Sequence, residues 1–319
     1  MSTVGRRPST ASGVPLDEMM QMAVVARRHY LEGRTKVEIA DELGISRFKV
    51  SRVLEAALRS GVVRIEIDVP ESVDTDLSVR LRSAFGLERA VVVSPEDPRP
   101  ETVRDVLGRA AARLLMDTAT GRDVLGVTSG RTIDAMTRHL TALPPCEVVQ
   151  LTGMSGDLNE NSVDVVRRVN GVARGRVSAI YAPMTVATAG AAVALKTDPG
   201  IASAFARFAS VTMAYVAVGS WQPPDSRYYD GLPVTDREQM VALGVSADFG
   251  GSLVDAAGRP VDALDDRVIG ISLEQLRLIP SVVLVGGGAR KAGAIRSVLL
   301  SGAVTSVVTD TSVAQALLR

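Results

Sequence analysis

Cysteine and histidine are scarce in this chain of 319 residues, which contains one cysteine, Cys146, and two histidines, His29 and His139. A single cysteine cannot form an internal disulfide, and these three residues do not make up a typical zinc site. The sequence also has no Walker motif and no arrangement typical of a Ser/His/Asp triad. We therefore expect no metal, no cofactor and no enzymatic activity.

Long apolar runs and an excess of one charge are lacking as well. No run approaches the ~20 apolar residues that a membrane helix needs. Residues 1–15 contain Ser, Thr, Gly and Pro but not the apolar core of a signal peptide. We expect a disordered tail over residues 1–15, a cytoplasmic protein and no membrane partner. The 36 basic and 36 acidic residues cancel, so binding to nucleic acid would depend on a local basic patch.

The apolar pattern changes along the chain near Val69-Pro70. Residues 16–69 begin with apolar side chains at helical spacing, whereas residues 70–319 alternate short β-branched runs with helical patterns. This change predicts a small helical domain followed by an α/β domain with a doubly wound, mainly parallel sheet. The expected strands of the second domain are 90–94, 123–128, 147–151, 177–181, 211–218, 281–285 and 306–309. The expected helices include 101–118, 133–140, 162–173, 273–278, 291–300 and 312–318.

Capping residues mark two short helices within residues 35–58. Thr35 and Glu38 fit a capping box at the start of the first helix, and Gly44 can take the left-handed conformation that ends it. Apolar residues three and four apart line one side of the second helix, and basic and hydroxyl residues line the other. This pattern predicts a helix-turn-helix, whose second helix enters the major groove of double-stranded DNA. The candidate DNA-binding residues are Thr35, Ser46, Arg47, Lys49, Ser51 and Arg52.

An alternating segment, residues 62–68, follows Gly61 and predicts a strand that forms a wing. Arginine in the second helix suits DNA recognition because its planar guanidinium can pair with guanine O6 and N7. The same pattern also fits an α-helical hairpin with a solvated basic face. We favour the helix-turn-helix because a wing-like strand and a domain large enough to bind a ligand follow it.

Several segments, in order along almost the whole chain, resemble the SorC family of sugar-responsive bacterial transcription regulators. Residues 43–54 and 61–65 resemble the family's DNA-reading module, and residues 126–132 resemble its Gly-Arg-Thr loop. The chain departs from the family pattern at Ser129, where tryptophan is common, and at Ala247, where glycine precedes the aspartate. The further matching segments are residues 149–153, 181–183, 218–220, 267–271, 286–291 and 309–310.

The resemblance implies a C-terminal domain related in fold to sugar-phosphate isomerases. It implies that this domain binds a phosphorylated sugar or polyol and controls a carbohydrate-utilisation operon. It also implies a homodimer or homotetramer on operator DNA. Two alternatives stay open: a regulator that senses an unphosphorylated polyol, and a sugar-phosphate isomerase-like enzyme, since a fold by itself does not establish chemistry.

Strand ends followed by glycine-containing turns supply the candidate effector site. Gly130 allows close approach to the backbone and Arg131 offers a charged fork, which favours an anion at the start of the next helix. Three glycines after strand 281–285 repeat this arrangement before Lys291, one of only four lysines in the chain. Trp221 fits either a sugar-stacking role or a core or interface role, and Asp248 fits either a hydroxyl ligand or a solvated loop carboxylate. The candidate effector-binding residues are Thr128, Ser129, Gly130, Arg131, Thr132, Gln150, Thr152, Asp248, Gly287, Gly288, Lys291 and Asp310.

Overall fold

The computed structural model describes residues 14–65, 72–154 and 162–319. Contacts divide the chain into two compact units, residues 1–69 and residues 70–319. Most of the expected N-terminal tail, residues 1–13, lies outside the described residues. Within the described ranges, no helix has the length and apolar character needed to cross a bilayer.

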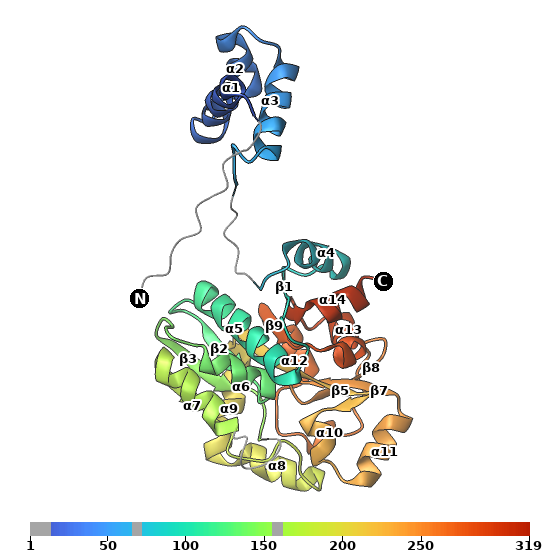
Figure 1. Cartoon of the computed structure of the whole chain (residues 1–319). Helices are drawn as coiled ribbons and strands as arrows, with labels where there is room; N and C mark the ends of the chain where they lie inside the picture. Colours follow the sequence, from blue (N-terminus) through green and yellow to red (C-terminus); the bar gives the residue numbers. More distant parts are fainter. Residues whose placement is uncertain (1–13, 66–71, 155–161) are drawn as a thin grey trace, which may run out of the picture. The chain divides into compact units, whose positions relative to one another are not determined.

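The described part of the N-terminal unit is a bundle of the α-helices α1, α2 and α3 (Figure 1). Helix α1 (Leu16–Ala26) continues into a π-helical turn (Arg27–Leu31), and α2 (Lys36–Leu43) and α3 (Arg47–Arg59) follow. The capping box is confirmed: the Thr35 backbone N donates to Glu38 Oε2 at 2.8 Å, and the Glu38 backbone N donates to Thr35 Oγ1 at 3.3 Å. Gly44 ends α2 with a φ of 65°, and Ser46 Oγ accepts from the Lys49 backbone N to start α3. The core of the unit consists of Val25, Ala26, Ile39, Ala40, Val50 and Leu54.

The expected wing strand over residues 62–68 is wrong for the part that the structure describes. Residues 62–65 form no strand, and residues 66–68 lie outside the described residues. The Val63 backbone N instead donates to the Ala57 carbonyl at 2.9 Å, and the Val63 side chain packs against the core of the three helices. An alternating segment becomes a strand only beside a partner that accepts its hydrogen bonds. The described part of this unit offers no such partner.

The C-terminal unit is built on a parallel sheet with the strand order β1-β10-β9-β5-β2-β3-β4. All seven expected strands are present, although β4 begins three residues before the expected strand. The doubly wound α/β class is therefore confirmed. The strands are β1 (Arg89–Val93), β2 (Val124–Val127), β3 (Cys146–Gln150), β4 (Arg174–Ser178), β5 (Met213–Trp221), β9 (Ser281–Val285) and β10 (Ser306–Asp310).

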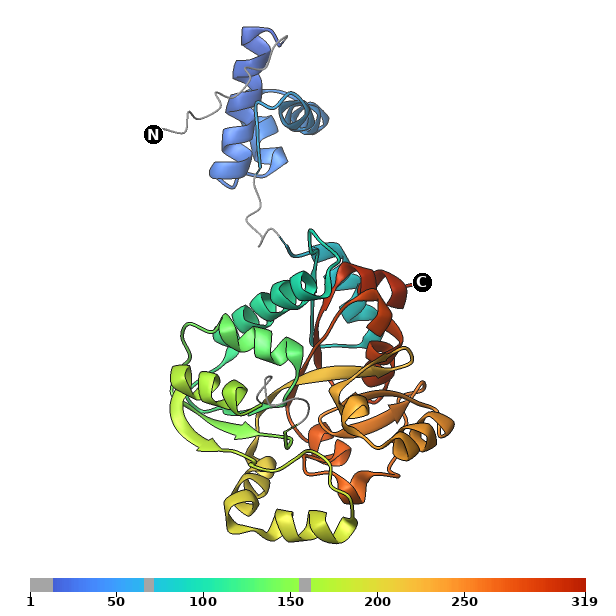
Figure 2. The same ribbon diagram turned by 60° about the horizontal axis from the view of Figure 1, so that its bottom comes forward.

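Successive side chains of each strand pack on opposite faces of the sheet, so both faces are apolar. In β5, Met213 and Tyr215 belong to one core, and Ala214 and Val216 belong to the other. Helices contribute to both cores (Figures 1 and 2). The first core includes α5 (Pro100–Thr118), α6 (Arg131–Arg138) and α7 (Ser162–Ala173). The second includes α4 (Thr75–Phe85), α8 (Ala189–Thr197), α9 (Pro199–Arg207), α12 (Leu273–Arg277), α13 (Ala292–Leu300) and α14 (Thr311–Leu317).

An antiparallel extension of β5 is the part of the fold that the sequence pattern did not predict. The far end of β5 pairs with β6 (Pro224–Asp225) and β7 (Val245–Phe249), and β7 pairs with β8 (Ser252–Asp255). Helices α10 (Arg227–Gly231) and α11 (Val234–Ala242) lie between β6 and β7 in the chain. Single-turn 3₁₀ helices complete the unit at Phe208–Ser210, Asp265–Arg267 and Ala289–Lys291.

Candidate functional site

The carboxyl ends of β2, β3, β9 and β10, together with the middle of β5, surround a cavity of about 420 Å³. Strand β2 is followed by β3 and β4 on one side of the sheet, whereas β5 is followed by β9 and β10 on the other. The cavity therefore lies at the topological switch point, where open α/β sheets bind ligands, and its volume is typical of small-molecule sites. The structure brings eleven of the predicted effector residues to its wall: Thr128, Ser129, Gly130, Arg131, Thr132, Thr152, Asp248, Gly287, Gly288, Lys291 and Asp310.

Gln150 is the predicted effector residue that does not line this cavity. Its side chain is buried: Nε2 donates to the Thr152 carbonyl at 2.7 Å, and Oε1 accepts from the Ile180 backbone N at 3.1 Å. The amide thus links the end of β3 to the segment after β4. A strand-end position does not by itself decide whether a side chain faces the cavity or the interior.

The loop after β2 is held in place by its own hydroxyls and by Thr152. Thr128 Oγ1 accepts from the Ala217 backbone N at 3.1 Å, and the Ser129 backbone N donates to Thr152 Oγ1 at 3.4 Å. Helix α6 then begins at Arg131, and its N-cap residue is Gly130, which has no side chain that could cap it. An uncapped helix N-terminus beside a cavity favours an anionic ligand group, because its first N–H groups carry partial positive charge.

Two glycines of the site make room for two carboxylates. An added Cβ at Gly287 would overlap Asp310 Oδ2, and one at Gly219 would overlap Asp248 Oδ1. Asp310 accepts from the Gly288 backbone N and caps α14 by accepting from the Ser312 backbone N at 2.8 Å. Asp310 thus ties the glycine-rich loop after β9 to the start of α14. Its carboxylate is therefore engaged in holding these two segments of the chain together.

Asp248 lies in strand β7 rather than in a loop, and it is partly exposed at the cavity wall. It accepts from Trp221 Nε1 at 2.9 Å and from Ser226 Oγ, and burial raises the pKa of Asp248. Trp221 itself is 1% exposed, and its ring packs edge-on against Tyr228 and Tyr229. The core role of Trp221 therefore holds, and its ring is not placed to stack on a ligand.

Asp225, which sequence reasoning missed, joins the two predicted cationic residues. It pairs with Arg131, and its Oδ2 lies 3.4 Å from Lys291 Nζ. Lys291 Nζ also donates to the Val218 carbonyl at 3.0 Å. Burial would raise the pKa of Asp225, but Lys291 and Arg131 outweigh it and hold that pKa below its ordinary value. Burial lowers the pKa of Lys291.

Cationic side chains outnumber acidic ones at the cavity wall. Besides Arg131 and Lys291, the lining includes Arg104 from α5, Arg227 from α10 and Arg290. The lining carboxylates are Asp225, Asp248 and Asp310. Asp225 pairs with two of these cations, whereas the carboxylate of Asp310 caps a helix. The wall therefore suits a ligand that carries negative charge.

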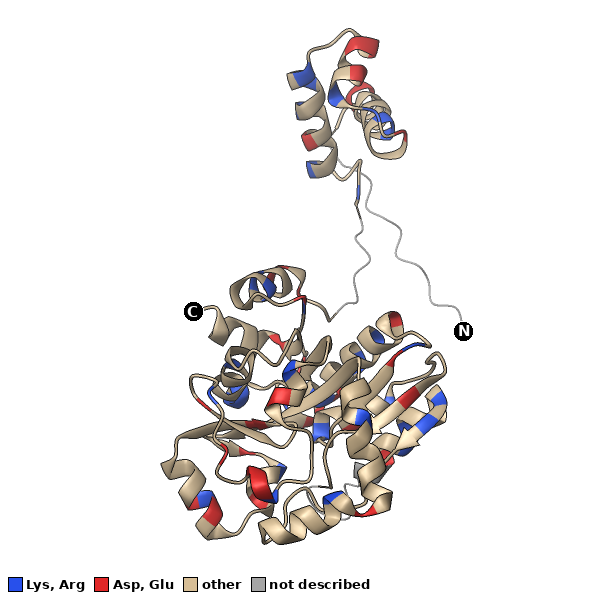
Figure 3. Cartoon of the chain, turned by 180° about the vertical axis from the view of Figure 1, so that it is seen from behind, with Lys and Arg blue, Asp and Glu red and all other residues tan. Residues whose placement is uncertain are grey.

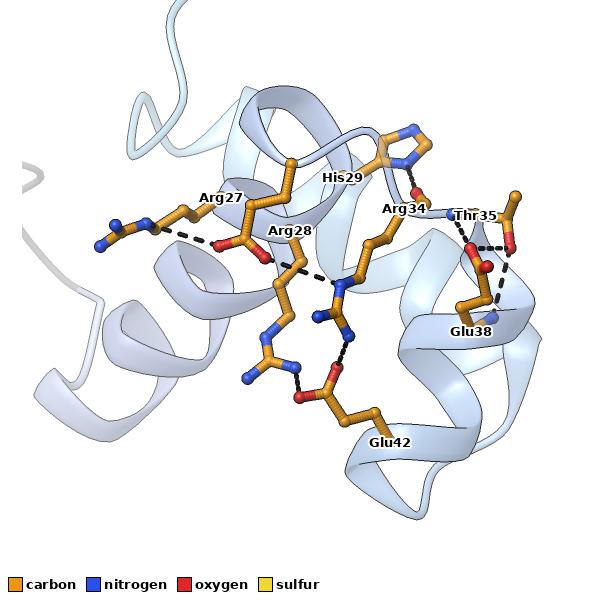
Figure 4. Close-up of polar contacts among 8 residues, drawn as sticks. Arg27, Arg28, His29, Arg34, Thr35, Glu38 and Glu42 are labelled. Atoms are coloured by element: carbon orange, nitrogen blue, oxygen red, sulfur yellow. Dashed lines mark hydrogen bonds and ion pairs between the residues drawn. The ribbon is translucent and has the colours of Figure 1, made fainter.

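The arginines before α2 in the N-terminal unit are engaged with glutamates (Figure 4). Arg34 Nη1 lies 2.6 Å from Glu42 Oε2, and Arg28 pairs with the same carboxylate. Arg27 Nε lies 3.7 Å from Glu32 Oε1. The two pairs with Glu42 tie the segment before α2 to that helix, and the positive charge of these arginines is largely neutralised within the unit.

Helix α3 carries basic residues that are not neutralised in this way. Arg47, Lys49 and Arg52 are exposed, and none forms an ion pair with another described residue. The hydroxyls of Thr35 and Ser46 serve as helix caps. Charges of both signs are spread over the ribbon elsewhere (Figure 3). The third helix thus presents several basic side chains that have no ion pair with another described residue; Lys36 at the start of α2 and Arg64 after α3 also have none.

A helix-turn-helix with a basic second helix, together with an α/β domain that has a cation-rich cavity, is the organisation of a ligand-responsive transcription regulator. The "Putative sugar-binding domain" family model matches residues 70–319. The chain belongs to the SorC family of sugar-responsive transcription regulators.

Curated relatives and solved structures resemble the chain over nearly all of its length. It is 31% identical over 303 residues to the uncharacterized transcriptional regulator YjhU of Escherichia coli K12, a match that covers 91% of this chain and 92% of the relative. It is 30% identical to the transcriptional regulator LsrR of an Enterobacter species, with 97% and 96% of the two chains covered. The full-length sorbitol operon regulator SorC of Klebsiella pneumoniae has the same fold, with a TM-score of 0.71, 21% identity and coverage of 95% and 100%.

Proposed function

We propose that the protein controls a carbohydrate-utilisation operon and that a phosphorylated sugar or polyol in the α/β cavity regulates its binding to operator DNA. The observation that carries this proposal is the wall of the cavity. Five cationic residues and three acidic ones line it, and two of the three carboxylates are held by internal contacts. A phosphate group forms stronger, charge-assisted hydrogen bonds with these cations than a neutral hydroxyl does.

The phosphate position that we propose lies between Arg131 and Lys291. Asp225 holds both cations there, so the phosphate would take over the role of this carboxylate. The N-terminus of α6 adds backbone donors to the same position. The sugar hydroxyls would then face the remaining polar wall, which includes Thr128, Thr152 and the glycine-rich loop after β9.

Thermal stabilisation with a panel of sugars and their phosphates tests this proposal. Tetritol, pentose and hexose phosphates are each compared with the matching unphosphorylated compound. A ligand present at about a hundredfold over its Kd adds roughly 2.7 kcal/mol to the free energy of unfolding. Stabilisation by an unphosphorylated polyol but not by its phosphate would favour the polyol sensor instead. Turnover of the stabilising compound in a coupled assay would favour the isomerase-like enzyme.

Two cavity variants test the phosphate position, once the panel has identified a stabilising compound. Arg131→Ala and Lys291→Ala each remove a charge-assisted hydrogen bond that contributes ~1.5–3 kcal/mol. The affinity measured by calorimetry should therefore fall by about ten- to a hundredfold. Both variants should still bind operator DNA but lose the response to the effector. Arg113→Ala is the control, because Arg113 is exposed on α5 and pairs with Asp117. Unchanged affinity in both cavity variants would exclude this phosphate position.

A further inference from the structure

The second residue of α3, Phe48, is an exposed aromatic side chain on the DNA-reading helix. Its exposed fraction is 80%, whereas Val50 and Leu54 of the same helix are buried. An aromatic ring gains free energy by leaving water, and no described residue of this unit covers Phe48. The exposure therefore indicates a binding role outside the helix bundle.

The position of Phe48 is central to the face of α3 that points away from the core. At 3.6 residues per turn, Phe48 lies about 180° around the helix from the buried Ala57. Arg52 lies one turn further along on the same side, since residues four apart are neighbours on a helix. Arg47 and Lys49 flank Phe48 in the chain, and both are exposed. The outward face at the start of α3 is thus an apolar ring among three cations.

The cations indicate which partner covers this ring. Arg47, Lys49 and Arg52 form no ion pair with described residues, whereas Arg28 and Arg34 of the same unit are paired with Glu42. A surface with an apolar centre and a cationic surround complements the major groove, which exposes thymine methyl groups between two rows of phosphates. A purely apolar protein surface would leave these three cations without partners and without water.

We propose that Phe48 contacts the 5-methyl group of a thymine in the operator and so selects thymine at that position. This inference rests on the DNA-binding function of α3. It adds an apolar contact to the hydrogen bonds expected from the arginines. Phe48 was not among the residues that the sequence pattern indicated, because a basic and hydroxyl pattern draws attention only to polar side chains.

Replacement of single thymines by uracil tests the proposal, because uracil lacks only the methyl group. The duplex is one selected from a random library by the full-length protein without added sugar. Each thymine in it is replaced in turn, and binding is measured for the wild type and for Phe48→Ala. For the wild type, uracil at one or two positions should weaken binding about fourfold, the effect expected for one buried methyl group. Phe48→Ala should bind the unmodified duplex about tenfold or more weakly and should no longer distinguish thymine from uracil there.

The controls separate this contact from folding and from general DNA affinity. Leu31→Ala removes an apolar side chain that is 81% exposed in the π-helical turn, and it should leave the profile of the uracil scan unchanged. Arg52→Ala should weaken binding but keep the thymine preference. Thermal unfolding of Phe48→Ala should match the wild type, because the removed ring is exposed. Equal binding by Phe48→Ala and the wild type would overturn the proposal. A uniform loss with the same uracil profile would also overturn it, since it would assign Phe48 to the sugar–phosphate backbone. If the wild type selected no sequence at all, sequence-specific DNA binding by α3 would be contradicted, and this proposal with it.

Discussion

At the scale of single residues, the cavity is organised by pairs in which a glycine admits a carboxylate. Gly219 admits Asp248, and Gly287 admits Asp310; in each case a Cβ would overlap the carboxylate oxygen. These carboxylates are satisfied internally, by Trp221 and Ser226 for the first and by backbone N–H groups for the second. Asp225 differs because its partners are the two cations that we assign to the effector.

Asp225→Asn should therefore strengthen the binding of a phosphorylated effector or of inorganic phosphate. The substitution removes the carboxylate that competes for Arg131 and Lys291, and we expect about a tenfold gain in affinity, or ~1.4 kcal/mol. Calorimetry measures this gain, and Asp230→Asn, an exposed residue of α10 outside the cavity wall, is the control. Weaker binding by Asp225→Asn would instead show that Asp225 accepts a hydroxyl of the effector.

The same variant has an expected effect on pH dependence. The pKa of Asp225 is lowered in the folded protein, so its carboxylate stabilises the fold above the ordinary pKa of aspartate. This contribution is lost as the pH falls through the lowered value. Urea unfolding of Asp225→Asn should show a lower stability at neutral pH than the wild type and a smaller loss of stability on acidification.

At the scale of elements, the close approach of α5 and α6 positions two cavity arginines. An added Cβ at Gly108 of α5 would lie 2.7 Å from the Ala135 carbonyl carbon and 2.8 Å from the Met136 backbone N, both in α6. Arg104 and Arg131 extend from these two helices to the cavity wall. Backbone atoms cannot move aside as a side chain can, so a larger residue at position 108 must separate the helices.

Gly108→Ala should lower the free energy of unfolding by about 1–3 kcal/mol, the usual cost of overpacking, and should also weaken effector binding. Gly171→Ala is the matched control, because Gly171 is exposed in α7 and a Cβ there meets no atom within 4 Å. Alanine in an exposed helix interior should stabilise the protein by about 0.5–1 kcal/mol. Urea unfolding measures both effects. A Gly108→Ala variant as stable as the wild type would show that α5 and α6 can separate without cost.

At the scale of the whole molecule, one reading helix contacts few base pairs, so we expect two or more copies to bind together. The prediction is a homodimer or homotetramer on a near-palindromic site. Its half-sites should be separated by whole turns of DNA, about 34–36 Å per turn. Sedimentation velocity measures the assembly, and footprinting measures the spacing. A monomer at micromolar concentration, with and without operator DNA, would contradict this prediction.

The features that could be predicted correctly from the sequence are those that depend on residues close together in the chain. The capping box at Thr35 and the left-handed Gly44 depend on neighbouring residues alone, and both are present in the structure. The seven parallel strands follow from β-branched runs between helical patterns. The antiparallel strands β7 and β8 were missed because their short segments derive stability from pairing with β5 and each other. The prediction of a wing strand was wrong for the related reason that no described strand pairs with residues 62–65.

The sequence by itself determined the class of the domain, the reading helix and the two glycine loops, because periodicity, caps and strand-end glycines are local properties. Only the tertiary structure decided which charges meet. It brings Asp225 to Arg131 across 94 residues of sequence, turns Gln150 into the interior and joins Asp248 to Trp221 by a hydrogen bond. Such partners depend on how the strands are ordered and how β5 extends beyond the parallel sheet. A residue's spacing from its neighbours in the chain carries no information about that order.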